Sequence, residues 1–306
     1  MKCPICKDKR VTPVPPPGRA KDSNAVVSHI AFGVPILQCN SCGFMFADFI
    51  HPQVIEFLYR GFGRSGTSEE KLQELRDMGE HFAEAQMRFM KPHLPENISC
   101  ALDFGGGMGA MTDRLTTIAD EVWISELDKP AIEKIDHSRG IKFVTNDGLA
   151  DDSFAGKFDL VILSNVLEHM NNPLMQIARF SRLCKPGGLF FIEVPFEEKF
   201  VRGTGGHLMQ HILFFSPYTL RRAIATQGSF DIVAFNQSGP PVDEMIAERK
   251  LIHRPEADET EDGWVIRTLL RNARPVTELP TDSLDMEDLQ SVAKALSLQS
   301  MTLVNT

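Results

Sequence analysis

The feature that most constrains the fold is a run of four glycines within five positions, from Gly105 to Gly109. It follows a short apolar segment, residues 100–104, which has the pattern of a buried strand, and a helical apolar pattern begins at Met111. In α/β proteins a strand that passes through a glycine turn into a helix lets a ligand contact the backbone. Glycine suits such a turn because it accepts positive φ and has no Cβ to hold the ligand away. We therefore expect an α/β fold with a ligand site at this turn.

Two ligand classes fit the turn. Gly105-x-Gly107-x-x-Ala110 matches a dinucleotide fingerprint. Asp103-x-Gly105-x-Gly107-x-Gly109 resembles the first motif of class I methyltransferases, which use S-adenosylmethionine (SAM). The Asp103 carboxylate would repel a pyrophosphate but attract the ammonium and sulfonium of SAM, so SAM is favoured. A glycine turn that binds nothing is the remaining alternative.

Composition limits the other classes. The chain has 306 residues, which is enough for one full domain plus an accessory. A formal net charge of -9 disfavours a nucleic-acid partner, because phosphate binding uses clustered lysine and arginine. No apolar run approaches the roughly 18 residues of a membrane span, and the N-terminus lacks the apolar segment of a signal peptide. We expect a cytoplasmic protein.

Four of the six cysteines form two CxxC pairs, Cys3 with Cys6 and Cys39 with Cys42. Two such turns supply the four thiolates of a tetrahedral zinc site. The 32 residues between the pairs exceed the roughly 15–20 of a compact ribbon, and the proline-rich stretch 14–18 accounts for the excess. A redox pair or a site that has lost its metal are the alternatives. We predict a structural Zn²⁺ with no position open for catalysis.

Alternating strand and helix patterns fill the rest of the chain and indicate a parallel sheet, closed by an antiparallel pair of strands. The predicted strands after the glycine turn are residues 121–125, 141–144, 158–163, 189–195, 230–235 and 264–270. The predicted organisation is a zinc ribbon (1–48), a helical connector or lid (49–95), a SAM-binding domain (96–274) and a C-terminal helical tail (275–306).

Within the connector, Thr67 and Glu70 form a capping-box pattern at the start of a long helix, and a short helix is expected at 51–59. The charged stretch 243–262 is expected to be an exposed helical or mobile insertion, and the tail to hold one amphipathic helix.

An acid 21 residues beyond Gly105, Glu126, lies where nucleotide-binding α/β folds place a carboxylate on ribose hydroxyls. Asp128 is the alternative, but Glu126 directly follows the strand.

Taken together, several ordered motifs resemble those of class I SAM-dependent methyltransferases over residues 96–235. They are residues 103–109, Glu126, 159–163, 164–169 and 185–188. The resemblance implies a Rossmann-like, doubly wound, mostly parallel seven-stranded sheet. It implies that Asp147 meets the adenine amino group and that Asn165 contacts the cofactor. The Asn-Asp-Gly sequence around Asp147 is also simply a good turn.

The two CxxC pairs resemble a subgroup with an N-terminal zinc ribbon, which implies a sugar, surface-polysaccharide or natural-product acceptor. Sugar C-methyltransferases of that subgroup carry a further C-terminal domain for which this chain has no room, so we expect O- or N-methylation. Lys7 stands where that subgroup usually has glycine, and we expect a different turn there.

A hydroxyl acceptor needs a base, usually histidine or a carboxylate. The stretch 203–211 follows the fifth strand and holds His207, the first candidate, and His211, the second, because apolar residues follow it. A solvated or capping histidine is the alternative for each. Glu168 is a candidate for contact with acceptor or cofactor, and His169 fits better as a structural residue at a helix start.

Two other functions stay open at this stage. One is an RNA or protein methyltransferase that grips its substrate with the ribbon, although basic and aromatic residues are sparse in residues 1–48. The other is a SAM-binding protein without turnover.

Overall fold

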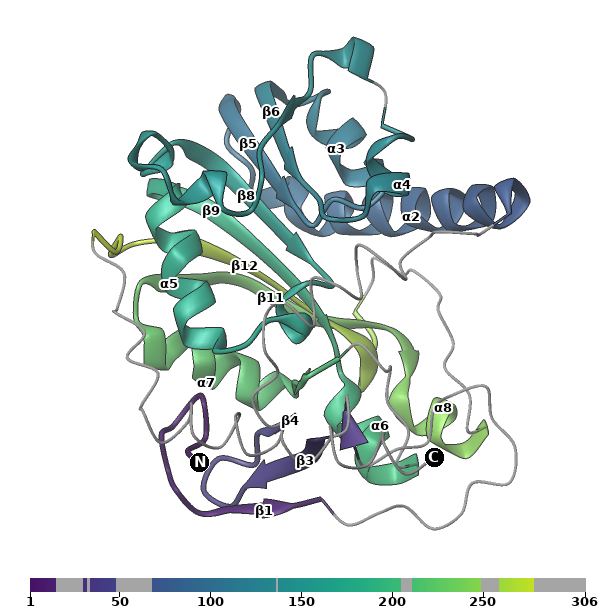
Figure 1. Ribbon diagram of the computed structural model, residues 1–306, viewed down its shortest axis with the longest axis vertical. Helices are drawn as coiled ribbons and strands as arrows, with labels where there is room; N and C mark the ends of the chain where they lie inside the picture. Colours follow the sequence, from purple (N-terminus) through teal and green to yellow (C-terminus); the bar gives the residue numbers. More distant parts are fainter. Residues whose placement is uncertain are drawn as a thin grey trace, which may run out of the picture.

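The computed structural model describes residues 1–14, 30–31, 34–47, 68–135, 137–204, 211–248 and 259–277. Its centre is a seven-stranded sheet in the order β11-β12-β9-β8-β5-β6-β7 (Figure 1). The strands are β5 (Ile98–Phe104), β6 (Ala119–Ser125), β7 (Lys142–Phe143), β8 (Phe158–Ser164), β9 (Cys184–Pro195), β11 (Phe230–Pro241) and β12 (Gly263–Asn272).

The sheet is mostly parallel, as predicted. Strands β5 to β9 pair in parallel, and β12 runs antiparallel to both of its neighbours, β9 and β11. The last two strands therefore form the expected antiparallel pair, with β11 at the edge and β12 inserted beside β9. Strands β9 and β11 are longer than their apolar runs indicate, because each continues through residues with weak strand propensity, Lys185–Gly188 and Asn236–Pro241.

Helices cover both faces of the sheet. Successive strand residues alternate between the faces, so Leu102 packs with α5 (Pro173–Leu183) and α7 (Pro217–Gln227), whereas Ala101 packs with α2 (Glu69–Met90) and α3 (Ala110–Leu115). Figure 1 shows these helix pairs on opposite sides of the sheet. The result is a doubly wound three-layer architecture.

Helix α2 comes from the predicted connector and packs against the glycine turn. Its residue Leu72 packs with Met108 of the turn and with Ala131 of α4 (Lys129–Ile132). The side chain that caps α2 belongs to Ser68, whose hydroxyl accepts from the backbone N of Lys71 (3.3 Å), rather than to Thr67 as the sequence indicated. Thr67 lies outside the described residues.

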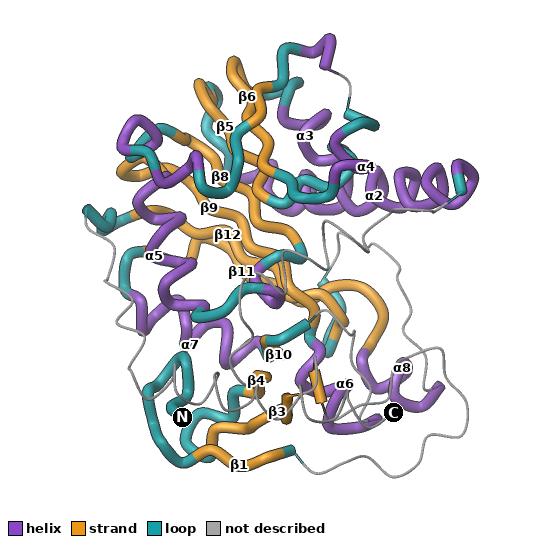
Figure 2. The backbone as a smooth tube through the Cα atoms, viewed as in Figure 1, coloured by secondary structure: helices purple, strands orange, loops and turns teal. Residues whose placement is uncertain are grey.

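The N-terminal strands form a second sheet that borrows a strand from the main domain. Strands β1, β3 and β4 are followed in this sheet by β10 (Leu213–Phe214), which pairs antiparallel with β4 (Figure 2). The N-terminal strands are β1 (Val11–Pro13), β2 (Ile30–Ala31), β3 (Val34–Cys39) and β4 (Met45–Ala47), with β2 paired to β3. The rings of Phe44 and Phe215 pack in a tilted arrangement at 5.2 Å between centroids, so the ribbon shares one apolar core with the α5–α7 face.

Shorter elements complete the chain. Helix α8 (Val242–Glu248) opens the charged stretch predicted at 243–262, and it buries Val242 and Met245. The remaining short elements are the 3₁₀ turns η1 (Lys91–His93), η2 (His137–Arg139), η3 (Gly148–Ala150), η4 (Asp152–Phe154) and η5 (Leu167–His169), and helix α6 (Glu197–Thr204).

The predicted helices at 51–59 and in the C-terminal tail lie outside the described residues. Among the helices that are described, none is long and apolar enough to cross a membrane.

Candidate active site at the carboxyl edge of the sheet

Most of the residues singled out from the sequence follow the carboxyl ends of the parallel strands. The glycine turn follows β5, Glu126 follows β6, Asp147 lies beyond β7, and Asn165 and Glu168 follow β8. In open α/β sheets ligands bind at this edge. The fold therefore brings these residues to one side of the molecule.

The glycine turn has the close packing that excludes side chains. Gly105 has φ +74°, and a Cβ built on it would lie 2.4 Å from Cγ2 of Val166. A Cβ on Gly106 would lie 2.7 Å from Oδ2 of Asp103 and 2.6 Å from Cδ1 of Ile124. The turn is anchored by the Gly105 N–H, which donates to the Ser125 carbonyl (2.7 Å). Only glycine fits these two positions, and the backbone is left bare toward the sheet edge.

Asp103 lies directly beneath the turn. Its carboxylate is 2% exposed and accepts a hydrogen bond from the Thr112 hydroxyl of α3 (2.6 Å). Burial raises the pKa of Asp103 from 3.8 to about 6, although the Thr112 bond opposes the rise. The group is thus a buried anion at neutral pH that also joins β5 to α3.

Glu126 organises the turn from the neighbouring strand. One carboxylate oxygen accepts from the Gly107 N–H (2.7 Å), and the other accepts from the N–H groups of Leu127 (2.6 Å) and Asp128 (2.9 Å). Between the two acids predicted as alternatives, Glu126 is half-buried and touches the glycine turn, whereas Asp128 is buried.

Asn165 lies at the end of β8 in a left-handed conformation, φ +52°. Its side-chain amide donates to Glu193 on β9 (3.0 Å), and its backbone N–H donates to the Glu193 carbonyl (2.8 Å). Glu193 also accepts from Gln86 of α2 (2.6 Å) and from Arg267 of β12 (2.5 Å). Glu193 and Arg267 are both fully buried, so this ion pair links β9 to β12 near the carboxyl edge of the sheet.

Asp147 is exposed in the turn that leads into η3, and no side-chain cap bond engages it there. Its position beyond β7 fits either the predicted adenine contact or a simple turn.

A second group of ionisable side chains lies beside this edge. Glu168 and His169 belong to η5, and His211 precedes β10. The Nε2 atoms of His169 and His211 lie 3.8 Å and 3.9 Å from Oε1 of Glu168, and the two imidazole rings meet edge to face at 4.6 Å between centroids. His211 Nδ1 donates to the carboxylate of Glu197, in the first turn of α6. We call Glu168, His169, His211 and Glu197 the Glu–His cluster.

The cluster is almost closed to solvent. Glu168 and Glu197 are 0% exposed and His211 is 5% exposed. Burial raises the pKa of Glu168 to about 7, against the opposing charge of His211. Burial alone would lower the pKa of His211, but the carboxylates of Glu197 and Glu168 outweigh it and raise that pKa.

The four predicted zinc ligands converge in the ribbon. Sγ of Cys3 lies 3.6 Å from Sγ of Cys42, and Sγ of Cys6 lies 3.5 Å from Sγ of Cys39. All four sulfurs lie within 4.8 Å of one another. Zn–S bonds of about 2.3 Å in a tetrahedron separate the sulfurs by about 3.8 Å, so the set fits Zn²⁺. Lys7 adopts φ +60°, close to the +77° of Gly43. The expected difference in the first turn is therefore wrong, because lysine accepts the left-handed conformation there.

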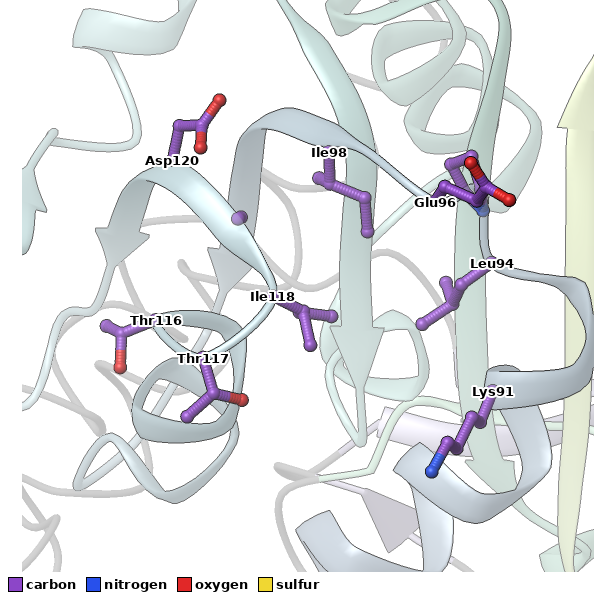
Figure 3. A pocket seen from close by; sticks show the side chains of 10 residues that line it. Lys91, Leu94, Glu96, Ile98, Thr116, Thr117, Ile118 and Asp120 are labelled. Atoms are coloured by element: carbon purple, nitrogen blue, oxygen red, sulfur yellow. The ribbon is translucent and has the colours of Figure 1, made fainter.

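A cavity of about 570 Å³ lies at the opposite edge of the sheet. Figure 3 shows Lys91, Glu96 and Asp120 around it, with Ile98, the first residue of β5. Since ligands of such sheets bind at the carboxyl ends of the strands, this amino-end cavity is not the candidate active site.

Comparison with known proteins agrees with the geometry. A family model described as a methyltransferase domain matches residues 73–233, just over half of the chain. The chain belongs to this family. The match begins within α2 and ends within β11.

Individual relatives are distant. The ubiquinone biosynthesis O-methyltransferase of Methylococcus capsulatus is 29% identical over 113 residues, which are 35% of this chain and 47% of that protein. The chain thus spans about half the length of the curated relative that it matches.

Two solved structures share the fold. The 1,6-didemethyltoxoflavin-N1-methyltransferase of Burkholderia thailandensis, with 1,6-didemethyltoxoflavin and S-adenosylhomocysteine bound, is 16% identical with a TM-score of 0.52, over 77% of this chain and 98% of that one. A SAM-dependent methyltransferase of Leishmania major is 15% identical with a TM-score of 0.51, over 71% and 82% of the two chains. The fold is that of class I methyltransferases.

Two members of the Glu–His cluster were not predicted as functional residues of the methyltransferase domain. The sequence pattern favours a structural role for His169, and it assigns no role to Glu197. A usable signal existed for Glu197, because it follows β9 by two residues, as Glu126 follows β6 by one. The glycine-rich stretch predicted from Gly203 begins as the last turn of α6, and His207 lies outside the described residues.

Proposed function

We propose that the chain transfers a methyl group from SAM to a hydroxyl or amine of a small-molecule acceptor. The observation that carries this proposal is the glycine turn with two acids around it, Asp103 beneath and Glu126 beside it, at the carboxyl edge of a methyltransferase sheet. The S-adenosylhomocysteine bound to the toxoflavin methyltransferase supports the cofactor class.

In the proposed complex the bare backbone of Gly105, Gly107 and Gly109 lies against SAM. Asp103 contributes negative charge toward the ammonium and sulfonium. Glu126 accepts from the ribose hydroxyls, and the donor N–H groups it now holds keep its carboxylate in place. Asp147 and Asn165 line the adenine and methionine ends.

The four cysteines are proposed to hold a structural Zn²⁺. Their sulfurs form a closed shell, so the ion would stabilise the ribbon without entering the reaction.

The acceptor is proposed to enter beside the Glu–His cluster. The C–S bond of SAM breaks as the bond to the acceptor oxygen or nitrogen forms, and the acceptor proton leaves to a base. We propose a histidine that follows α6 in the sequence as that base, with His207 and His211 as the candidates and Glu168 on the acceptor side. The name of the Methylococcus relative supports O-methylation of a small molecule. The support for a sugar or nucleotide-sugar acceptor is the resemblance of the two CxxC pairs to the zinc-ribbon subgroup.

Titration calorimetry with SAM and S-adenosylhomocysteine tests the cofactor. Binding is expected for both and is expected to weaken at least tenfold in Glu126→Gln, which loses the charge on a ligand-facing acceptor. The matched control is Glu96→Gln, an exposed acid at the opposite edge. Absence of heat with SAM together with clear binding of NAD would overturn the proposal.

Transfer of labelled methyl from SAM to a panel of nucleotide sugars, phenols and amines tests the acceptor. The variants His207→Asn and His207→Ala are measured with SAM affinity as the control. Full turnover in both variants would remove His207 as the base.

A further inference from the structure

Glu168 is a buried carboxylate to which no side chain of the described residues donates a hydrogen bond. Its side chain is 0% exposed. Burying an ionised carboxylate costs several kcal/mol unless a cation or donors compensate, and buried charges in proteins are paired or bind metals. A positively charged partner beside Glu168 would therefore offset the cost of burying its carboxylate.

The two histidines nearest to Glu168 present nitrogen atoms to the same point. His169 Nε2 and His211 Nε2 lie 3.8 Å and 3.9 Å from the same oxygen, Oε1 of Glu168. One ligand atom from each of the three residues lies within 4.8 Å of the others. The three residues come from two distant segments of the chain, the end of β8 and the start of β10.

The tautomer of His211 is fixed by its hydrogen bond to Glu197. Its Nδ1–H donates to the Glu197 carboxylate, so in the neutral ring the lone pair is on Nε2, the atom that faces Glu168. A carboxylate that accepts from the far nitrogen of a ligating histidine is the usual support of a metal site.

We propose that Glu168, His169 and His211 bind a divalent first-row transition metal ion, with Glu197 as the support of His211. Two imidazoles and one carboxylate suit ions such as Zn²⁺, Fe²⁺ or Co²⁺, whereas Mg²⁺ and Ca²⁺ prefer oxygen ligands alone.

The spacing is close to that of a formed site. Metal–nitrogen bonds of about 2.1 Å in a tetrahedron separate ligand atoms by about 3.4 Å. The two separations from Glu168 are 3.8 Å and 3.9 Å, so each histidine nitrogen needs to approach Oε1 of Glu168 by only about half an ångström. All three ligand atoms lie within 4.8 Å of one another.

Three protein ligands leave a position for an outside oxygen, which distinguishes this site from the closed four-cysteine site. For its role this inference rests on the proposed function. An acceptor hydroxyl bound at that position would lose its proton to water more readily, because the cation stabilises the alkoxide. His211 would then act as a ligand and not as the base.

The test uses Co²⁺ as the probe, added to the full chain with its ribbon metal retained. The wild-type protein is expected to bind one further Co²⁺ per chain, with visible bands that lack sulfur-to-metal charge transfer. Glu168→Gln and His211→Gln are expected to lose this ion, and Glu197→Gln to weaken it about 10- to 100-fold. The matched control, His93→Gln, changes an exposed histidine of η1 and should leave binding unchanged.

Glu168→Gln keeps the shape of the side chain and removes a buried charge, so it is expected to fold, and its melting temperature verifies this. Wild-type protein that binds SAM but no further Co²⁺ would overturn the metal site and leave the proposed function intact. Co²⁺ binding that survives both Glu168→Gln and His211→Gln would also overturn the site. Wild-type protein that does not bind SAM would instead count against the proposed function.

Discussion

The buried charge of Asp103 is expected to lower the stability of the fold and to raise the affinity for SAM. The variant Asp103→Asn allows the two effects to be measured separately. The side-chain oxygen of asparagine still accepts from the Thr112 hydroxyl, so the link between β5 and α3 is kept. What the variant removes is the buried negative charge beneath the glycine turn.

The magnitude follows from the pKa of Asp103. A value of about 6 in the folded protein, against 3.8 for the free group, means that the ionised form is disfavoured by burial. The difference corresponds to about 3 kcal/mol of unfolding free energy. Because the folded state holds the proton more tightly, this cost is absent below about pH 4, grows between pH 4 and pH 6, and is complete at higher pH.

Urea unfolding followed by tryptophan fluorescence measures the effect. At pH 8 Asp103→Asn is expected to be more stable than the wild-type protein by up to about 3 kcal/mol, and the difference should shrink as the pH falls toward 4. In calorimetry the same variant is expected to bind SAM at least tenfold more weakly, because the attraction to the positive ligand is lost.

The control is Asp120→Asn, which changes an exposed acid at the amino end of β6. It is expected to alter neither stability nor SAM affinity. A variant Asp103→Asn that is less stable than the wild type at pH 8, or that binds SAM equally well, would refute the reasoning.

Three further outcomes are expected. Gly105→Ala places a Cβ 2.4 Å from a methyl group of Val166 at positive φ, and should lower SAM affinity at least tenfold in calorimetry while zinc content stays unchanged. Glu193→Gln leaves the fully buried Arg267 without its counter-ion and should lower the unfolding free energy by about 3–5 kcal/mol, measured by urea titration; a loss below 1 kcal/mol would contradict this. Cys39→Ser should reduce bound zinc, measured by elemental analysis, and lower the melting temperature; unchanged zinc would exclude the four-cysteine site.

Much of the main sheet could be predicted from the sequence because its signals are local. The apolar runs before Gly105 and Glu126 predict the strands β5 and β6, and the glycine turn between them predicts the edge of the sheet at which the ligand binds. The same locality explains the small errors. Ser68 and Thr67 are both good caps, and the sequence pattern does not distinguish the residue that adopts the extended capping conformation.

The Glu–His cluster could be predicted only in part, because its members come from three segments. Glu168 and His211 were singled out separately, each from its own surroundings. Their meeting depends on the path of β10, a strand of two residues that has no periodicity to detect. The hydrogen bond from Ile212 N to the Glu168 carbonyl (2.9 Å), which joins the two segments, is a long-range backbone contact that composition does not encode.

Strand β10 has one more consequence, for any attempt to divide the protein. In the neighbouring residue Ile212, the carbonyl accepts from the Ala47 N–H and the N–H donates to the Glu168 carbonyl, so a single residue joins the N-terminal sheet to the Glu–His cluster. A chain shortened to begin after the ribbon would leave the Ile212 carbonyl without the Ala47 N–H and would uncover the Phe215 ring, which packs against Phe44. Loss of the ribbon structure should thus first displace His211, which precedes Ile212, while most of the seven-stranded sheet stays folded.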